Sequence, residues 1–179
     1  MPRLFTALAV PPEIADALAV YRGGLQGARW VEPADFHVTL RFLGDVERPV
    51  AEDFLDSLAE ARLRGPLTVT LDGLGTFGGG KPRALYASIH PSADLADLQA
   101  EQERFARRAG LAPETRKFTP HVTLARLRRE ASPEAVAMYL SQAPVFTPLT
   151  FTADRVTVYS ARESTGGGPY LAEAAFPFA

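Results

Sequence analysis

Apolar residues recur along the chain with two different spacings, which predict a mixture of strands and helices. From Phe36 to Leu43 every second side chain is apolar, and polar residues dominate the positions between them. This alternation predicts a half-buried strand whose second face carries polar chemistry. Similar short segments predict strands at 3–10, 28–31, 36–43, 67–74, 84–89, 122–127, 149–153, 155–160 and 170–178. Apolar positions that recur every three or four residues predict helices at 12–21, 51–62, 94–109 and 133–140.

The order of these segments favours an α+β fold. Strands and helices do not alternate strictly, so a parallel sheet built from βαβ units is not predicted. We expect two antiparallel sheets with helices on their outer faces. No Pro- or Ser-rich linker divides the chain, so residues 1–179 are expected to form a single domain of two interleaved lobes.

Composition narrows the possible functions. Hydrophobic residues make up 46% of the 179 residues, which is enough for a sizeable core, and the net charge is −2. The near-balance of charge excludes a protein that coats nucleic acid with a strongly basic surface, although a local basic cleft remains compatible with it. The absence of cysteine excludes disulfides, thiolate zinc sites and cysteine nucleophiles. Residues 1–8 do not read as a signal peptide and no apolar run reaches about 18 residues, so we expect a cytoplasmic protein with no membrane partner.

The clearest chemical signal is a repeated tetrad. Two of the three histidines open the same sequence, His-Val-Thr-Leu, at 37–40 and at 121–124. A given histidine is followed by Val-Thr-Leu by chance about once in several thousand trials. The repeat therefore indicates two similar half-units that each present one histidine and one threonine to a shared cleft.

Each tetrad begins a predicted strand, so its histidine and threonine point to the same face. Imidazole has an unperturbed pKa near 6.5, and one copy can be neutral while the other is charged. A neutral imidazole accepts a proton from water, and a protonated one donates a proton to a departing alkoxide. His37 and His121 on opposite sides of a phosphorus atom therefore fit an in-line displacement. The hydroxyls of Thr39 and Thr123 are expected to hold phosphate oxygens.

Both tetrads, with their flanks, resemble the 2H phosphoesterases and, more narrowly, the RNA 2′,3′-cyclic phosphodiesterases, also known as 2′-5′ RNA ligases. The resemblance covers nearly the whole chain. It is carried by the opening strand 3–8, the segments 29–31 and 36–44, the segment 120–126, and the closing segments 168–170 and 176–178.

This resemblance implies a bilobal fold with a pseudo-two-fold axis and a central cleft. It implies metal-independent hydrolysis of RNA 2′,3′-cyclic phosphate ends to 2′-phosphates, without a cofactor, and the possibility of reverse 2′-5′ RNA ligation. By this likeness His37 is the proton donor to the leaving 3′-oxygen and His121 is the proton acceptor from water. The substrate is an RNA with a cyclic phosphate end or a cyclic nucleotide, and a monomer is expected.

Three further residues are candidates for substrate contact. Arg126 matches a family arginine that binds phosphate, and Phe42 matches an aromatic residue that stacks on the base. Both lie five positions after a histidine, so a regular strand would turn them away, and a bend or bulge is needed. Arg41 lies four positions after His37, on the same face of a regular strand, and is the geometric rival for the phosphate.

Other signals do not support a competing site. Residues 75–81 have the spacing of a nucleotide P-loop, but Pro82 stands where Ser or Thr is required and a strand follows. We expect instead a loop that brings Lys81 and Arg83 near the cleft mouth. His90 is interpreted as structural, and no metal-ligand motif is present. Two alternatives to the phosphodiesterase remain open: a non-catalytic module that binds RNA ends, and an enzyme for another small cyclic phosphate or a 2′-5′ linked oligonucleotide.

Overall fold

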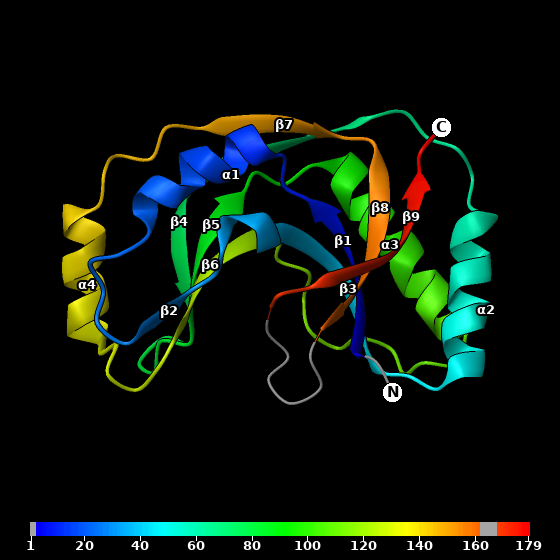
Figure 1. Cartoon of the computed structure of the whole chain (residues 1–179), viewed down its shortest axis with the longest axis horizontal. Helices are drawn as coiled ribbons and strands as arrows, with labels where there is room; N and C mark the ends of the chain where they lie inside the picture. Colours follow the sequence, from blue (N-terminus) through cyan, green and yellow to red (C-terminus); the bar gives the residue numbers. More distant parts are fainter. Residues whose placement is uncertain (1–2, 162–167) are drawn as a thin grey trace.

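The computed structural model describes residues 3–161 and 168–179 and contains one large antiparallel sheet with helices packed against it (Figure 1). Its strands are β1 (Arg3–Ala9), β2 (Ala28–Trp30), β3 (His37–Asp45), β4 (Leu67–Phe77), β5 (Ala84–Ile89), β6 (His121–Leu127), β7 (Leu149–Ala153), β8 (Arg155–Ala161) and β9 (Leu171–Pro177). Its helices are α1 (Pro12–Leu18), α2 (Arg48–Ala59), α3 (Ala93–Arg108) and α4 (Pro133–Gln142), with short 3₁₀ turns at Ala19–Tyr21 and Pro33–Asp35. The predicted α+β class is confirmed.

The sheet follows the order β7-β4-β5-β6-β3-β1-β8-β9, and β2 pairs with β6 outside this path. Its two halves, β7-β4-β5-β6 and β3-β1-β8-β9, meet between β6 and β3, where Val38 pairs with Val122. The two expected sheets are therefore hydrogen-bonded into one. Strand pairing joins residues that are distant along the chain, so the sequence pattern does not show this junction.

Helices cross between the two halves of the sheet. α1 follows β1, yet it lies on the side of β4 and β7; α3 follows β5, yet it packs beside α2 near β3, β1 and β8 (Figure 1). Ser92 caps the first turn of α3 by accepting a hydrogen bond from Leu95 N at 3.1 Å, and Ser132 caps α4 in the same way through Ala135 N. Each half of the sheet is thus covered by a helix that follows a strand of the other half.

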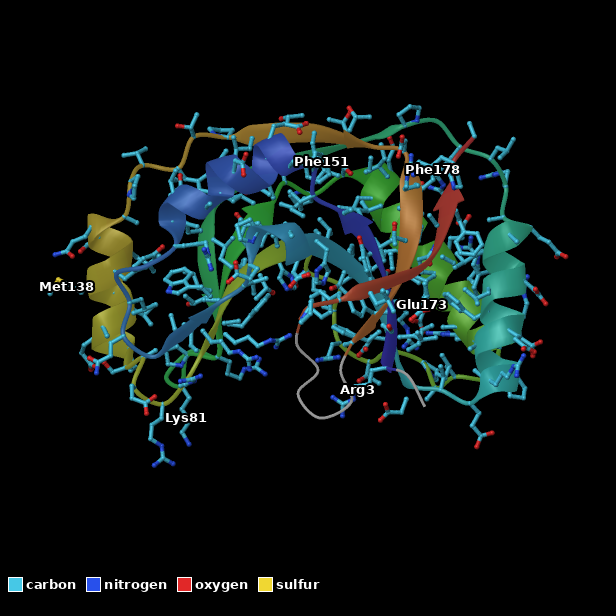
Figure 2. The ribbon with its side chains drawn as sticks, viewed as in Figure 1. Arg3, Lys81, Met138, Phe151, Glu173 and Phe178 are labelled. Carbon is cyan, nitrogen blue, oxygen red and sulfur yellow. The ribbon has the colours of Figure 1, made fainter. Side chains whose placement is uncertain are left out.

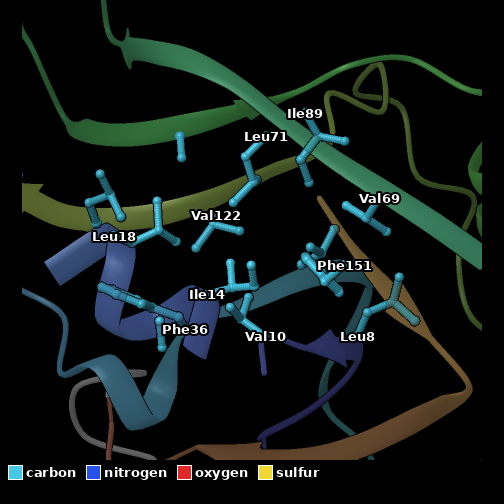
Figure 3. Packing of buried hydrophobic residues seen from close by; sticks show 14 of the residues in the cluster. Leu8, Val10, Ile14, Leu18, Phe36, Val69, Leu71, Ile89, Val122 and Phe151 are labelled. Carbon is cyan, nitrogen blue, oxygen red and sulfur yellow. The ribbon is translucent and has the colours of Figure 1, made fainter. Parts of the chain in front are cut away.

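The hydrophobic core lies on the face of the sheet opposite the tetrad histidines. Val38 and Val122 are completely buried, in one cluster with Ile14 and Leu18 of α1 and Phe151 of β7 (Figure 3). A second cluster forms under α2 and α3 and comprises Leu4, Leu43, Val46, Phe54, Leu58, Phe105, Ala106, Ala109 and Val158. The alternation of the tetrads is therefore satisfied, because their valines enter the core while His and Thr face away from it.

Some element boundaries differ from the sequence prediction. The segment expected to be a glycine-rich loop from residue 75 is still strand, because Thr76 pairs with Leu85 and Phe77 with Ala84. The turn begins at Gly78, whose φ of +109° favours glycine. Lys81 projects from this turn into solvent (Figure 2). Three consecutive glycines at 166–168 predict a flexible loop, and part of this segment lies outside the described residues.

In the described parts of the chain, no helix combines the length and the apolar character that a membrane crossing requires.

Candidate active site

The two tetrads lie side by side at the centre of the sheet. Val38 faces Val122 across the antiparallel junction, and this register aligns His37 with Thr123 and His121 with Thr39. All four of these polar residues line one cleft of about 440 Å³. The structure therefore brings the predicted histidines and threonines, which are 84 positions apart in the sequence, into a single site.

A β-bulge follows each tetrad histidine at the same position. In β3, Thr6 of β1 pairs with Arg41 and Ala7 pairs with Thr39, so Leu40 is the extra residue. In β6, the equivalent extra residue is Leu124. Each bulge places two consecutive residues on the buried face and returns the next one to the cleft face. Phe42 and Arg126 consequently line the cleft. Each does so because of the bulge that was predicted from its distance of five residues from a histidine.

Arg41 does not share the face of His37, which corrects the expectation from a regular strand. The bulge turns Arg41 toward α3, where only 8% of it is exposed. Its Nε donates to Glu103 Oε2, and its terminal nitrogens donate to the carbonyl oxygens of Phe42 and Ala112. Although Arg41 borders the cleft, its guanidinium is engaged in these bonds and is not available as the rival phosphate ligand.

The two imidazoles are oriented in the same way. Nδ1 of His37 lies 2.7 Å from the carbonyl oxygen of Asp35, and Nδ1 of His121 lies 2.6 Å from that of Thr119. A carbonyl oxygen only accepts, so each Nδ1 carries a hydrogen and donates it. Nε2 is then the nitrogen that each ring has available for proton transfer.

Burial dominates the electrostatics of both histidines. Burial lowers the pKa of His37, and the hydrogen bond to the Asp35 carbonyl partly opposes this. The charges of His121 and Arg126 lower the same pKa further, whereas the Asp35 carboxylate raises it. Burial also lowers the pKa of His121, and the bond to Thr119 partly opposes this. The two rings are therefore close enough to interact, and charges of both signs act on His37.

Aromatic rings surround both imidazoles, and sequence analysis did not identify them as site residues. Phe5 and Tyr170 lie 4.9 and 5.1 Å from His37 between ring centroids, and Tyr159 lies 6.2 Å away. Phe77 and Tyr86 lie 4.9 and 5.3 Å from His121. These rings come from strands distant in sequence, and only Phe5 and Tyr170 lie in segments that carry the family resemblance.

A loop between α3 and β6 contributes cations to the cleft. Arg116 and Lys117 line it, together with Arg83 from the β4–β5 connection, whereas Lys81 does not. Glu114 accepts bonds from the backbone and side chain of Arg116, and these bonds lower the pKa of Glu114 to about 2. The cleft thus has a basic character that the net charge of the chain does not reveal.

Glu103 of α3 anchors this loop to β3. Its carboxylate accepts bonds from Arg41, from Arg107 and from the backbone N of Glu114. Burial raises the pKa of Glu103, but these bonds outweigh it and hold the pKa below its ordinary value. Among the described residues no group of three or more potential ligands is arranged to hold a metal ion.

The fold and the paired tetrads are those of the two-histidine, or 2H, phosphoesterase class. The model of the 2′-5′ RNA ligase superfamily matches residues 10–165, and the chain belongs to this family.

Curated relatives carry one name. A protein of Aeropyrum pernix named RNA 2′,3′-cyclic phosphodiesterase is 39% identical over 100 residues, which are 55% of this chain and 56% of that protein. One of Escherichia coli with the same name is 32% identical over 134 residues, 72% of this chain and 74% of that protein. In the Aeropyrum relative and in one of Aquifex aeolicus, the matched region spans about half of the relative's length, 56% and 55%.

Solved structures share the fold. The crystal structure of a Thermus thermophilus protein superimposes with a TM-score of 0.79 at 25% identity and covers 98% of this chain and 97% of that one. The Escherichia coli LigT complex with 3′-AMP gives a TM-score of 0.76 at 24% identity, with 99% and 98% covered.

Proposed function

We propose that this chain, as a single domain of two interleaved lobes, hydrolyses RNA 2′,3′-cyclic phosphate ends to 2′-phosphates. The observation that carries the proposal is the convergence of the two tetrads on one cleft. Each of its histidines has Nδ1 bonded to a backbone carbonyl, which leaves Nε2 for chemistry. The names of the curated relatives support this substrate class.

The reaction is an in-line displacement at phosphorus. Neutral His121 accepts a proton from water at Nε2, and the water oxygen forms the new bond to phosphorus. The bond from phosphorus to the ribose 3′-oxygen breaks, and protonated His37 gives its Nε2 proton to that oxygen. The product is a 2′-phosphate, and each proton transfer accelerates the reaction by about 10²–10⁴-fold.

The division of roles follows the family likeness. Burial lowers the pKa of both rings, which favours the neutral form that the base requires. The carboxylate of Asp35 raises the pKa of His37, whereas the charges of His121 and Arg126 lower it.

Neighbouring residues complete the site. Thr39 and Thr123 offer hydroxyl donors to the non-bridging oxygens, where negative charge increases in the transition state. Arg126 adds a charged donor on the same face. Phe42 is 49% exposed, lies against the Phe5 ring that neighbours His37, and offers a ring on which the terminal base stacks. All these residues come from one chain, so the enzyme is expected to act as a monomer.

The test is turnover of a cyclic-phosphate-ended RNA and of a 2′,3′-cyclic nucleotide in the presence of EDTA, with the position of the product phosphate determined. We expect a 2′-phosphate, and loss of turnover in His37→Ala and His121→Ala. A 3′-phosphate product would refute the assigned leaving group. Tight binding of the RNA end with no turnover would instead favour a binding module, and turnover of the nucleotide alone would favour a small cyclic phosphate as substrate.

A further inference from the structure

The carboxylate of Asp35 fastens a segment from the C-terminal part of the chain beside the cleft. The backbone carbonyl of Asp35 accepts the Nδ1 hydrogen of His37 at 2.7 Å. Tyr170, 135 positions further along the chain than Asp35, donates its backbone N–H to Asp35 Oδ1 at 3.4 Å. The residues just before β9 are therefore bonded to the 3₁₀ turn that precedes β3.

Close packing at Gly168 determines where this carboxylate lies. A Cβ at position 168 would overlap Asp35 Oδ2 and would lie 3.1 Å from Asp35 Cγ. Glycine therefore lets the backbone at 168 lie directly against the Asp35 side chain. An alanine at this position would push the carboxylate aside and weaken its bond to Tyr170.

The fastened segment places the ring of Tyr170 on the imidazole of His37. The two rings meet edge to face, with 5.1 Å between centroids and an angle of 89°. Tyr170 meets Phe5 in the same manner at 5.1 Å and 81°, and Phe5 lies 4.9 Å from His37. Edge-to-face contact is a preferred aromatic arrangement, so these two neighbours restrict rotation of the imidazole.

His37, Asp35 and Tyr170 thus contact one another in every pair. The second tetrad differs at the matching position, because Thr119 stands two residues before His121 and has no carboxylate. Its backbone carbonyl accepts the Nδ1 hydrogen of His121, as that of Asp35 does for His37. The carboxylate contact therefore distinguishes the His37 side of the site from the otherwise similar His121 side.

A proton donor must point at the leaving oxygen when the bond to phosphorus breaks, and a misplacement of about 1 Å can lower a rate about 100-fold. We propose that Asp35, Gly168 and Tyr170 are positioning residues that hold the imidazole of the acid in the orientation for proton donation. This inference rests on the proposed function, in which His37 is the acid. Because the three residues act through His37, they assist departure of the 3′-oxygen and not the activation of water by His121.

The identity of the leaving group gives a test that a general loss of structure does not mimic. In cytidine 2′,3′-cyclic phosphate, the bond from phosphorus to the 3′-oxygen breaks and that oxygen takes the proton of His37. In the analogue with sulfur in place of the 3′-oxygen, the bond from phosphorus to sulfur breaks and a thiolate leaves. A thiol has a pKa of about 8.5, so the thiolate departs without a proton. The ratio of kcat for the two substrates therefore measures proton donation.

Variants at the three positions should share one selectivity, each measured at its own pH optimum. Tyr170→Leu should lower kcat for the oxygen substrate by about 10- to 100-fold with little change in KM, and kcat for the sulfur substrate by no more than about 3-fold. Gly168→Ala and Asp35→Ala should behave alike. Asp35→Asn keeps an oxygen that accepts from Tyr170 N and should recover most of the loss. His37→Asn sets the upper limit of the selectivity.

Matched controls lie away from the cleft. Phe146→Leu removes a ring that stacks on Tyr21, and a Cβ on Gly65 would meet nothing within 4 Å. Phe146→Leu and Gly65→Ala should leave the ratio of kcat for the two substrates unchanged.

The imidazole of His37 gives a second readout that needs no substrate. In the free enzyme, the Nδ1–H groups of His37 and His121 should both give proton–nitrogen signals, because both are bonded to backbone carbonyls. In Tyr170→Leu the His37 signal should be lost through exchange with water, whereas the His121 signal should remain. His121 is thus the internal control for correct folding of the same sample.

An equal loss of kcat for both substrates, a rise in KM without a fall in kcat, or an unchanged His37 signal in Tyr170→Leu would overturn the positioning role and leave the proposed function intact. Absence of any turnover of the oxygen substrate by the wild type would overturn the proposed function and this inference with it.

Discussion

Val38 of β3 lies directly opposite Val122 of β6, and both side chains are completely buried. An antiparallel residue pair has a local two-fold axis, and here that axis exchanges one His-Val-Thr-Leu tetrad for the other. The buried valines fix the register, so a slip of one strand by one residue would turn the histidine and threonine of that strand away from the cleft. A pseudo-two-fold axis for the whole fold stays a prediction.

The two histidines should control opposite limbs of the pH profile. Because the pKa of both rings is lowered, we expect kcat/KM to be greatest below pH 6.5. Activity falls at low pH as His121 gains a proton and falls at higher pH as His37 loses one. His37→Asn should remove the alkaline limb and His121→Asn the acidic limb, each with a loss of about 10²–10⁴-fold. The reverse pattern would exchange their roles.

Asp35 should set the position of the alkaline limb. Its carboxylate raises the pKa of His37, so Asp35→Asn, which keeps the backbone carbonyl, should move this limb to lower pH. The acidic limb should move little, because burial and the bond to the Thr119 carbonyl set the pKa of His121. Asp53→Asn on the exposed face of α2 is the control. A limb that stays in place in Asp35→Asn would mean that a group other than His37 produces it.

Arg126 should act on the phosphate rather than on the fold. It is exposed on the cleft face, and a hydrogen bond to a charged group contributes about 1.5–3 kcal/mol. Arg126→Met should therefore lower kcat/KM by about 10- to 150-fold with little change in the melting temperature. Arg128→Met, two residues further on and outside the cleft lining, should have near-normal kinetics. Equal losses of kcat/KM in both variants would indicate that these arginines attract the anionic substrate through their charge and that Arg126 makes no specific bond to the phosphate.

Arg41 and Glu103 should contribute to stability. Both partners are largely buried, with 8% and 15% of their side chains exposed, and removal of one charge from a buried pair costs about 3 kcal/mol. Glu103→Gln should lower the free energy of unfolding in urea by this amount. The matched exposed pair is Arg48 and Glu52, at 89% and 59% exposure, where Glu52→Gln should cost about 0.5 kcal/mol or less.

The same pair has a pH signature. The pKa of Glu103 is lower in the folded state than in the unfolded state. The charge of Glu103 therefore stabilises the fold fully above its unfolded-state pKa, and this stabilisation is lost as the pH falls through its folded-state pKa. The difference in unfolding free energy between wild type and Glu103→Gln should therefore shrink as the pH is lowered from 7 toward 3. A constant difference would assign the effect to packing instead of charge.

Gly75 and Gly73 offer a test of the two aromatic rings, Phe77 and Tyr86, that lie beside His121. A Cβ on Gly75 would overlap the Tyr86 ring, whereas a Cβ on Gly73 would meet only Ser88 Oγ at 3.4 Å. Gly75→Ala should displace Tyr86 from His121 and lower kcat, and Gly73→Ala should be nearly neutral. Normal turnover in Gly75→Ala would show that the Tyr86 ring does not position His121.

Several features of the site could be predicted because they depend only on neighbours in the chain. Alternation of apolar and polar residues places His37 and Thr39 on one face of a strand, and repetition of the tetrad assigns the same layout to His121 and Thr123. The same reasoning shows that Phe42 and Arg126 need a bulge, and both strands contain it.

Other features depend on contacts between residues that are far apart in sequence. The bulge at Leu40 turns Arg41 inward, and only the position of Glu103 on α3 explains why a buried guanidinium is tolerated there. Sequence alone could not place Phe77 and Tyr86 beside His121, or Arg116 at the cleft, because each arrives through strand pairing or loop anchoring.

The sequence by itself determined the chemistry, since residue identity and strand period are local properties of the chain. The tertiary structure decided the geometry of that chemistry. Antiparallel pairing of Val38 with Val122 brings two local patterns together, and packing around each ring sets its pKa and its neighbours. These are long-range effects of burial and register that no window of the sequence contains.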